Sequence, residues 1–123
     1  MYELRVITRF ASAHQLRDYG GKCENLHGHN WKIEVFVTGD SLEDNGLLID
    51  FRLVKEAAKS VVDKLDHQCL NEIDPFTTQN PSSENIARYL FESLSQKLNN
   101  RMIRVSRVSA WESDTACASY SEP

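Results

Sequence analysis

Residues 27–38 read HGHNWKIEVFVT, and this stretch decides how the chain folds. From Trp31 to Val37, apolar side chains stand at every second position. A period of two is typical of a β-strand that buries one face. The stretch therefore predicts a strand over 29–38, which is entered through His27-Gly28-His29 and ended by the turn residues Gly39-Asp40-Ser41.

The same alternation occupies residues 2–10, where Leu4, Val6 and Phe10 share a face with Tyr2 and Thr8. We expect a second strand there, separated from the first by a loop that contains Asp18, Gly20 and Gly21. If the two strands pair antiparallel, the end of one lies beside the start of the other.

Residues 50–98 change to a helical period. Asp50 is suited to cap a helix in which Phe51, Val54, Ala58, Val61 and Leu65 form one face. The run Asn80-Pro81-Ser82-Ser83-Glu84 has the composition of a second helix start. Alternation returns over 102–112, and a short strand is expected at 116–120. The order ββααββ predicts an α+β domain, with two helices on one face of an antiparallel four-stranded sheet.

Length and composition predict one soluble domain. The chain has 123 residues and a mass of 14.1 kDa, with 41% hydrophobic and 26% charged residues. We therefore expect a single domain over 1–123. No apolar run approaches the roughly 18 residues of a membrane span, and strand residues begin at Tyr2, which leaves no room for a signal peptide. The expected compartment is the cytoplasm, with no membrane partner.

The charges and cysteines narrow the expected partners. The net charge is -4, and the acidic surplus falls in residues 39–75, with no basic run suited to a phosphate backbone. Nucleic acid is therefore not an expected partner. The 3 cysteines form no C-x-x-C pair, which suits a reducing compartment rather than a disulfide framework.

Three histidines form the candidate metal site. In a strand His27 and His29 point to one face, and His14 follows the other strand on the parity of Phe10. Three imidazoles without a fixed fourth ligand describe a catalytic zinc site with an open position. Ordinary surface or core histidines are the plain alternative. A cupin site that includes Glu34 is disfavoured, because 51–98 has the pattern of helices rather than of barrel strands.

Cys23 and the Asp66-His67 pair each allow two interpretations. Cys23 could close the zinc site as a fourth ligand, or it could act as a thiolate base beside the metal. Asp66-His67 could simply end a helix, or it could be a carboxylate–imidazole pair that moves protons. Glu112 could be a solvated acid at a strand end. Periodicity does not decide among these interpretations.

Six motifs follow one another along the chain: Phe10-Ala11-Ser12-Ala13-His14, Cys23-x-x-x-His27-Gly28-His29, Gly46-Leu47-Leu48-Ile49-Asp50-Phe51, Leu65-Asp66-His67, Asn80-Pro81-Ser82-Ser83-Glu84-Asn85 and Glu112-Ser113-Asp114-Thr115-Ala116. In these motifs the chain resembles the 6-pyruvoyl-tetrahydropterin synthase / 6-carboxytetrahydropterin synthase family. The three-residue spacing after Cys23 resembles the bacterial queuosine-pathway (QueD-type) branch. The resemblance implies a T-fold subunit that assembles through its sheets into a homo-oligomer, commonly a hexamer.

The resemblance also implies roles for the candidate residues. The zinc ligands would be His14, His27 and His29, and Cys23 would be the catalytic base. Asp66 and His67 would be acid/base partners contributed by an adjacent subunit. Glu112 would anchor the pterin ring as part of the catalytic set, and Ser82 and Ser83 would line the pterin pocket.

The implied reaction is that of a zinc-dependent lyase. It converts 7,8-dihydroneopterin triphosphate to 6-carboxy-5,6,7,8-tetrahydropterin and releases acetaldehyde and triphosphate, in queuosine biosynthesis. Two alternatives stay open. The same scaffold could form the pyruvoyl product or process a related dihydropterin. A different class is a non-enzymatic pterin-binding module, in which zinc is closed off by Cys23.

Overall fold

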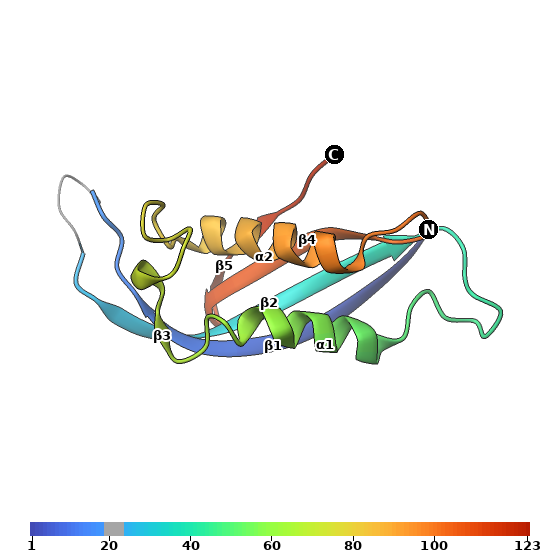
Figure 1. The fold of residues 1–123 in the computed structure, drawn as a ribbon, viewed down its shortest axis with the longest axis horizontal. Helices are drawn as coiled ribbons and strands as arrows, with labels where there is room; N and C mark the ends of the chain where they lie inside the picture. Colours follow the sequence, from blue (N-terminus) through green and yellow to red (C-terminus); the bar gives the residue numbers. More distant parts are fainter. Residues whose placement is uncertain (19–23) are drawn as a thin grey trace.

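The computed structural model describes residues 1–18 and 24–123. Five strands form one sheet in the order β3-β1-β2-β4-β5, and helices α1 and α2 lie over the same face of it (Figure 1). The α+β class and the ββααββ order of the long elements are confirmed. The elements are β1 (Tyr2–His14), β2 (His27–Gly39), α1 (Phe51–Val62), β3 (Gln68–Cys69), the 3-10 helix η1 (Leu70–Glu72), α2 (Ser83–Leu98), β4 (Arg104–Ser113) and β5 (Ala116–Tyr120).

The expected count of four strands is corrected to five. The additional strand, β3, has two residues and pairs parallel with Ser12 and Ala13 of β1. It is held there because the His67 N–H donates to the Ala11 carbonyl at 2.6 Å, while Asp66 Oδ1 accepts the Ala11 N–H at 2.8 Å. A strand of two residues is too short to show an alternating pattern, so the sequence does not predict it. Its place in the sheet is set by the hydrogen bonds just described.

The β1–β2 ladder sets the position of every later feature. The two strands pair antiparallel from Tyr2 opposite Gly39 to His14 opposite His27. Opposite residues share a face, so the predicted alternation places the apolar face of both strands beneath the helices. The fully buried side chains of β2 on this face are Trp31, Ile33, Val35 and Val37.

Both predicted helix starts are confirmed by their capping bonds. Asp50 accepts the Arg52 N–H at 2.9 Å, and Ser82 Oγ accepts the Asn85 N–H at 3.1 Å. One expected core position of α1 is wrong. Phe51 is 51% exposed and lines a surface groove with Arg5, Val6 and Ile7 of β1.

The pairing of β4 is irregular at two points. Between Phe36 and Val37 the register with β2 shifts, so that Val105 and Val108 are both buried although they are three positions apart. A second shift in the β4–β5 pairing falls at Glu112, between Trp111 and Ser113. β-Bulges of this kind re-aim a side chain. In the part of the chain that the structure describes, neither helix is both long and apolar enough to span a membrane.

Candidate metal centre

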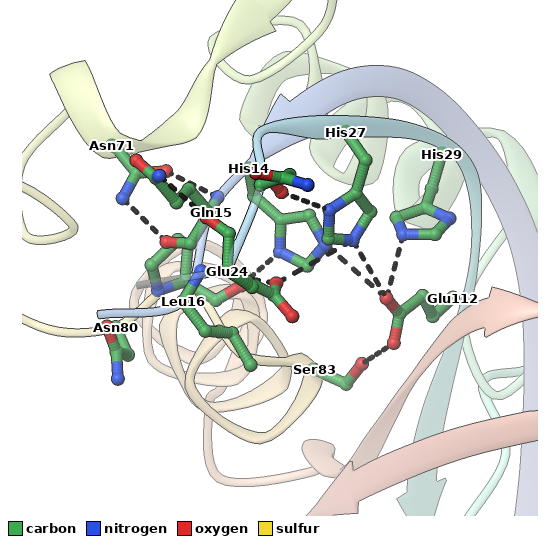
Figure 2. Close-up of polar contacts among 12 residues, drawn as sticks. His14, Gln15, Leu16, Glu24, His27, His29, Asn71, Asn80, Ser83 and Glu112 are labelled. Carbon is green, nitrogen blue, oxygen red and sulfur yellow. Dashed lines mark hydrogen bonds and ion pairs between the residues drawn. The ribbon is translucent and has the colours of Figure 1, made fainter. Parts of the chain in front are cut away.

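Three histidines meet at the end of the β1–β2 ladder. His14 lies opposite His27 in the register, and His29 follows two residues later on the same face. One ligand atom from each of these histidines and one carboxylate oxygen of Glu112 all lie within 4.8 Å of one another. Figure 2 shows the three rings and this carboxylate turned toward a common point.

Backbone carbonyls orient two of the rings. His14 Nδ1 lies 2.8 Å from the Pro81 carbonyl oxygen, and His27 Nδ1 lies 2.8 Å from that of Asn25. A carbonyl can only accept, so Nδ1 of each ring carries the proton and Nε2 presents its lone pair. Metal-binding histidines are held in the same way, with the distal nitrogen donating to a fixed acceptor.

The converging nitrogens suit a cation. The Nε2 atoms of His14 and His29 are buried and have no hydrogen-bond partner among residues 1–18 and 24–123. Burial lowers the pKa of His29, and the neighbouring His14 and His27 lower it further, while the Glu112 carboxylate opposes this shift. A neutral imidazole is the form that binds a metal. The residues therefore fit a divalent cation that prefers nitrogen ligands.

Glu112 extends into the cluster from β4. Its Oε1 lies 2.8 Å from His29 Nε2 and 3.4 Å from His14 Nε2. The first of these two distances is a close contact, although His29 Nε2 has no hydrogen-bond partner among residues 1–18 and 24–123. The other carboxylate oxygen lies 3.5 Å from Ser83 Oγ, in the first residue of α2. The sequence singled out Glu112 for pterin binding, whereas the structure also brings its carboxylate to the three histidines.

Trp31 is a site residue that the sequence reasoning treated only as core. Its ring meets those of His14 and His29 edge to face, at centroid distances of 5.2 and 5.6 Å. On its far side Phe10 stacks on it at 6.0 Å. The signal was present in the spacing, because Trp31 stands two residues beyond His29 on one strand face.

Asp66 and His67 form a separate pair at the outer edge of β1. His67 Nδ1 lies 3.0 Å from Asp66 Oδ2, and the His67 side chain is exposed. The Ala11 N–H that Asp66 accepts is the main cause of the lowered pKa of Asp66, and His67 lowers it further. The pair is not part of the four-residue cluster, but His67 and His29 both line one hollow of about 420 Å³.

The remaining predicted residues are placed as follows. Ser82 caps α2 with its hydroxyl oxygen, and Ser83 contacts Glu112. Cys23 lies outside the described residues, so the structure does not place it. The cluster, the asymmetric helix layer and the order of strands together define a T-fold protein with a candidate metal centre at one end of its sheet.

Comparison with known proteins identifies the family. The sequence model of the family described as "6-pyruvoyl tetrahydropterin synthase" matches residues 3–123, so the chain belongs to that family. Its structure is similar to that of the 6-pyruvoyl tetrahydropterin synthase of Caenorhabditis elegans, with a TM-score of 0.86 and 26% identity over 99% of this chain and 96% of that one.

Curated relatives carry two different activities in their names. The 6-carboxy-5,6,7,8-tetrahydropterin synthase of Synechocystis sp. is 34% identical over 119 residues, which cover 93% of this chain and 88% of that protein. The dihydroneopterin monophosphate aldolase of Pyrococcus furiosus is 36% identical over 110 residues, which cover 88% and 89%. The chain is thus an enzyme of the tetrahydropterin synthase family, and the names of these two relatives give two different reactions.

Proposed function

We propose that the protein is a zinc-dependent 6-carboxy-5,6,7,8-tetrahydropterin synthase. It converts 7,8-dihydroneopterin triphosphate to the carboxy product, with release of acetaldehyde and triphosphate, in cytoplasmic queuosine biosynthesis. The observation that carries the proposal is the convergence of the Nε2 atoms of His14, His27 and His29 on one point beside Glu112. Three neutral imidazoles with no fixed fourth protein ligand are the donor set of a catalytic rather than a structural zinc site.

The three histidines would hold the zinc ion, which would supply Lewis acidity that makes a C–H of the substrate side chain more acidic. Cys23, which lies outside the described residues, would accept that proton as the base. Asp66 holds His67 through the 3.0 Å contact, and His67 returns protons during loss of triphosphate.

Glu112 binds the pterin ring. A carboxylate can accept parallel hydrogen bonds from the amino group and adjacent N–H of the ring. Its Oε1 lies 2.8 Å from His29 Nε2, so a pterin held by this carboxylate would lie directly beside the histidine cluster. Ser83 lies 3.5 Å from the same carboxylate, and Ser82 precedes it, which supports their place in the pocket wall.

A second copy of the chain completes the site. Within one chain His67 stands apart from the histidine cluster, with its side chain 82% exposed. His67 and His29 line one open hollow, and a second copy that covers this hollow would enclose the exposed pair together with the histidine cluster. This separation supports a homo-oligomer, such as a hexamer, of T-fold domains spanning 1–123.

A related cleavage of a dihydropterin is the second candidate function. It is favoured by one specific observation, the similarity to the dihydroneopterin monophosphate aldolase of Pyrococcus furiosus. The pyruvoyl-forming reaction uses the same scaffold and is distinguished from the first two by its product. A zinc-stabilised module without activity is the remaining alternative, and it requires Cys23 as the fourth ligand.

Product identification tests the reaction. The purified zinc protein is incubated with 7,8-dihydroneopterin triphosphate, and products are separated by chromatography and mass. Acetaldehyde together with the 6-carboxy product is the expected result. Pyruvoyl-tetrahydropterin without acetaldehyde would refute the leading assignment. In a parallel incubation with the dihydroneopterin monophosphate, cleavage of that substrate and not of the triphosphate would support the aldolase.

Two variants test the residue roles. Cys23→Ala is expected to retain zinc but lose turnover, because its proposed role is that of a base; loss of the metal would instead make Cys23 a ligand. Glu112→Ala is expected to weaken pterin binding by at least tenfold, with Glu92→Ala as the control because Glu92 pairs with Arg88 on the exposed side of α2. Undiminished pterin affinity would remove Glu112 from the pocket.

A further inference from the structure

The chain just beyond β1 is hydrogen-bonded on two sides, although no strand among residues 1–18 and 24–123 pairs with it. β1 ends at His14, and Gln15, Leu16 and Arg17 follow. Their backbone groups are satisfied instead by side chains from distant parts of the chain and by Glu24.

Asn71 takes the place of a strand neighbour for Gln15. The Gln15 N–H donates to Asn71 Oδ1 at 2.8 Å, and Asn71 Nδ2 donates to the Gln15 carbonyl at 2.8 Å (Figure 2). An amide side chain has one acceptor and a donor, so it can reproduce the two-bond exchange of an antiparallel pair.

Asn80 makes the same exchange two residues later. The Arg17 N–H donates to Asn80 Oδ1 at 2.7 Å, and Asn80 Nδ2 donates to the Arg17 carbonyl at 2.8 Å. Alternate residues of an extended chain direct their backbone groups to the same side. The asparagine pair, Asn71 and Asn80, therefore continues the edge of β1 on which β3 already lies.

The opposite side of this segment is tied to Glu24. The Leu16 N–H donates to Glu24 Oε1 at 3.2 Å, and the Glu24 N–H donates to the Leu16 carbonyl at 3.1 Å. Glu24 stands three residues before His27. The segment that leaves His14 is thereby connected to the segment that enters His27.

The same stretch that holds Arg17 also holds the His14 ring. Pro81, directly after Asn80, supplies the carbonyl to which His14 Nδ1 donates. The Arg17 guanidinium donates to the carbonyls of Phe76 and Gln79, so this stretch is itself fixed to the segment it supports. Displacing Asn80 therefore displaces the acceptor that orients a buried imidazole.

We propose that Asn71 and Asn80 are positioning residues for the metal centre. They touch neither metal nor substrate; they act through the backbone of Gln15 and Arg17 and through the Pro81 carbonyl, which together fix the direction of the His14 Nε2 lone pair. The inference rests on the proposed function, because it concerns the metal that the three histidines hold.

Metal affinity of the folded, metal-free protein tests the proposal. Asn71→Ala and Asn80→Ala each remove both bonds of one exchange. The matched control is Asn100→Ala, which also removes two side-chain bonds to backbone, those from the Met102 and Ile103 N–H groups. Asn100 lines a surface beside Met1 and Gly39, at the opposite end of the β1–β2 ladder from His14.

Zinc affinity is measured by competition with a chromophoric chelator, at a temperature at which circular dichroism shows every variant to be folded. The asparagine-pair variants are expected to bind zinc 10- to 100-fold more weakly, the usual cost of losing a group that orients a ligand. Asn100→Ala is expected to bind within about twofold of the parent, although it too loses thermal stability. This contrast separates a positioning role from a general loss of structure.

Three results would overturn the positioning role while leaving the metal centre in place. One is unchanged affinity in both folded asparagine-pair variants. Another is an equal loss of affinity in Asn100→Ala. If the alanine variants do not fold, Asn71→Asp and Asn80→Asp decide, because each keeps the acceptor for the backbone N–H but turns a charged oxygen, in place of the donor, toward the carbonyl of Gln15 or Arg17. Parent-like affinity in both is the third. Absence of zinc binding by the parent protein would refute the metal centre itself, and the positioning role with it.

Discussion

Replacing the histidines one at a time should separate their structural role from their metal-binding role. Their side-chain exposures are 2% for His14, 25% for His29 and 37% for His27. His14→Ala leaves the buried Pro81 carbonyl without its donor, which costs about 1–3 kcal/mol, and creates a cavity beside Trp31. We expect the metal-free protein to lose about 2–4 kcal/mol of unfolding free energy.

His27→Ala should behave differently in the metal-free protein. The ring is more than a third exposed and its acceptor, the Asn25 carbonyl, belongs to an exposed residue, so water can replace the lost contact. The expected change is within about 0.5 kcal/mol. Both variants lose a ligand, however, so both should lose most of the roughly 2.7 kcal/mol by which zinc at 100 times its dissociation constant stabilises the parent.

Urea unfolding in chelator and in excess zinc measures both quantities for each variant. His67→Asn is the control, because His67 lies outside the cluster and asparagine tolerates its φ of 57°. His67→Asn should keep the full zinc-dependent increase in the free energy of unfolding. Equal losses for His14→Ala and His27→Ala in chelator would refute the burial argument. A full zinc increment in His27→Ala would remove His27 from the ligand set.

Three further changes test other parts of the site. Trp31→Phe should cost about 1–2 kcal/mol and abolish a zinc-dependent change in tryptophan fluorescence, because Trp111 then remains alone; a persisting change would assign the signal to Trp111. Ser82→Ala should cost about 0.5–2 kcal/mol in urea unfolding through loss of the α2 cap, and no measurable cost would contradict that role. Because the pKa of Asp66 lies below its usual 3.8, its contribution to stability is present above that value and lost as pH falls through the lowered pKa. In Asp66→Asn the urea concentration at the unfolding midpoint should fall less steeply as the pH is lowered. Parallel plots of this midpoint against pH for parent and variant would contradict the role of Asp66.

The strands and helices were predictable because their signals are local. Alternation from Trp31 to Val37 identified β2, and the hydroxyl or carboxylate before each helix identified Asp50 and Ser82 as caps. The cap depends on a side chain and backbone within three residues of each other, so no tertiary contact is needed to expect it. The five-strand count was missed because β3 is too short to have a period.

The histidine cluster was predictable once antiparallel pairing was assumed. His27 and His29 share a face by spacing alone, and parity placed His14 beside them. Glu112 could be nominated by resemblance, but its approach to His29 depends on the irregular β4–β5 pairing and on α2 beginning at Ser83. Neither a register shift nor the distance between elements leaves a period in the sequence.

By itself the sequence determined the class of each long element, the faces that are buried and the residue types able to hold a metal. Only the tertiary structure decided which carbonyl orients His14, that Trp31 packs against two histidines of the cluster, and that Asn71 and Asn80 extend the edge of β1. The physical reason is the separation along the chain over which each interaction acts. Propensity, capping and alternation act between neighbours in the chain, whereas the His14 ring and the segment after it are held by hydrogen bonds to residues more than fifty positions away.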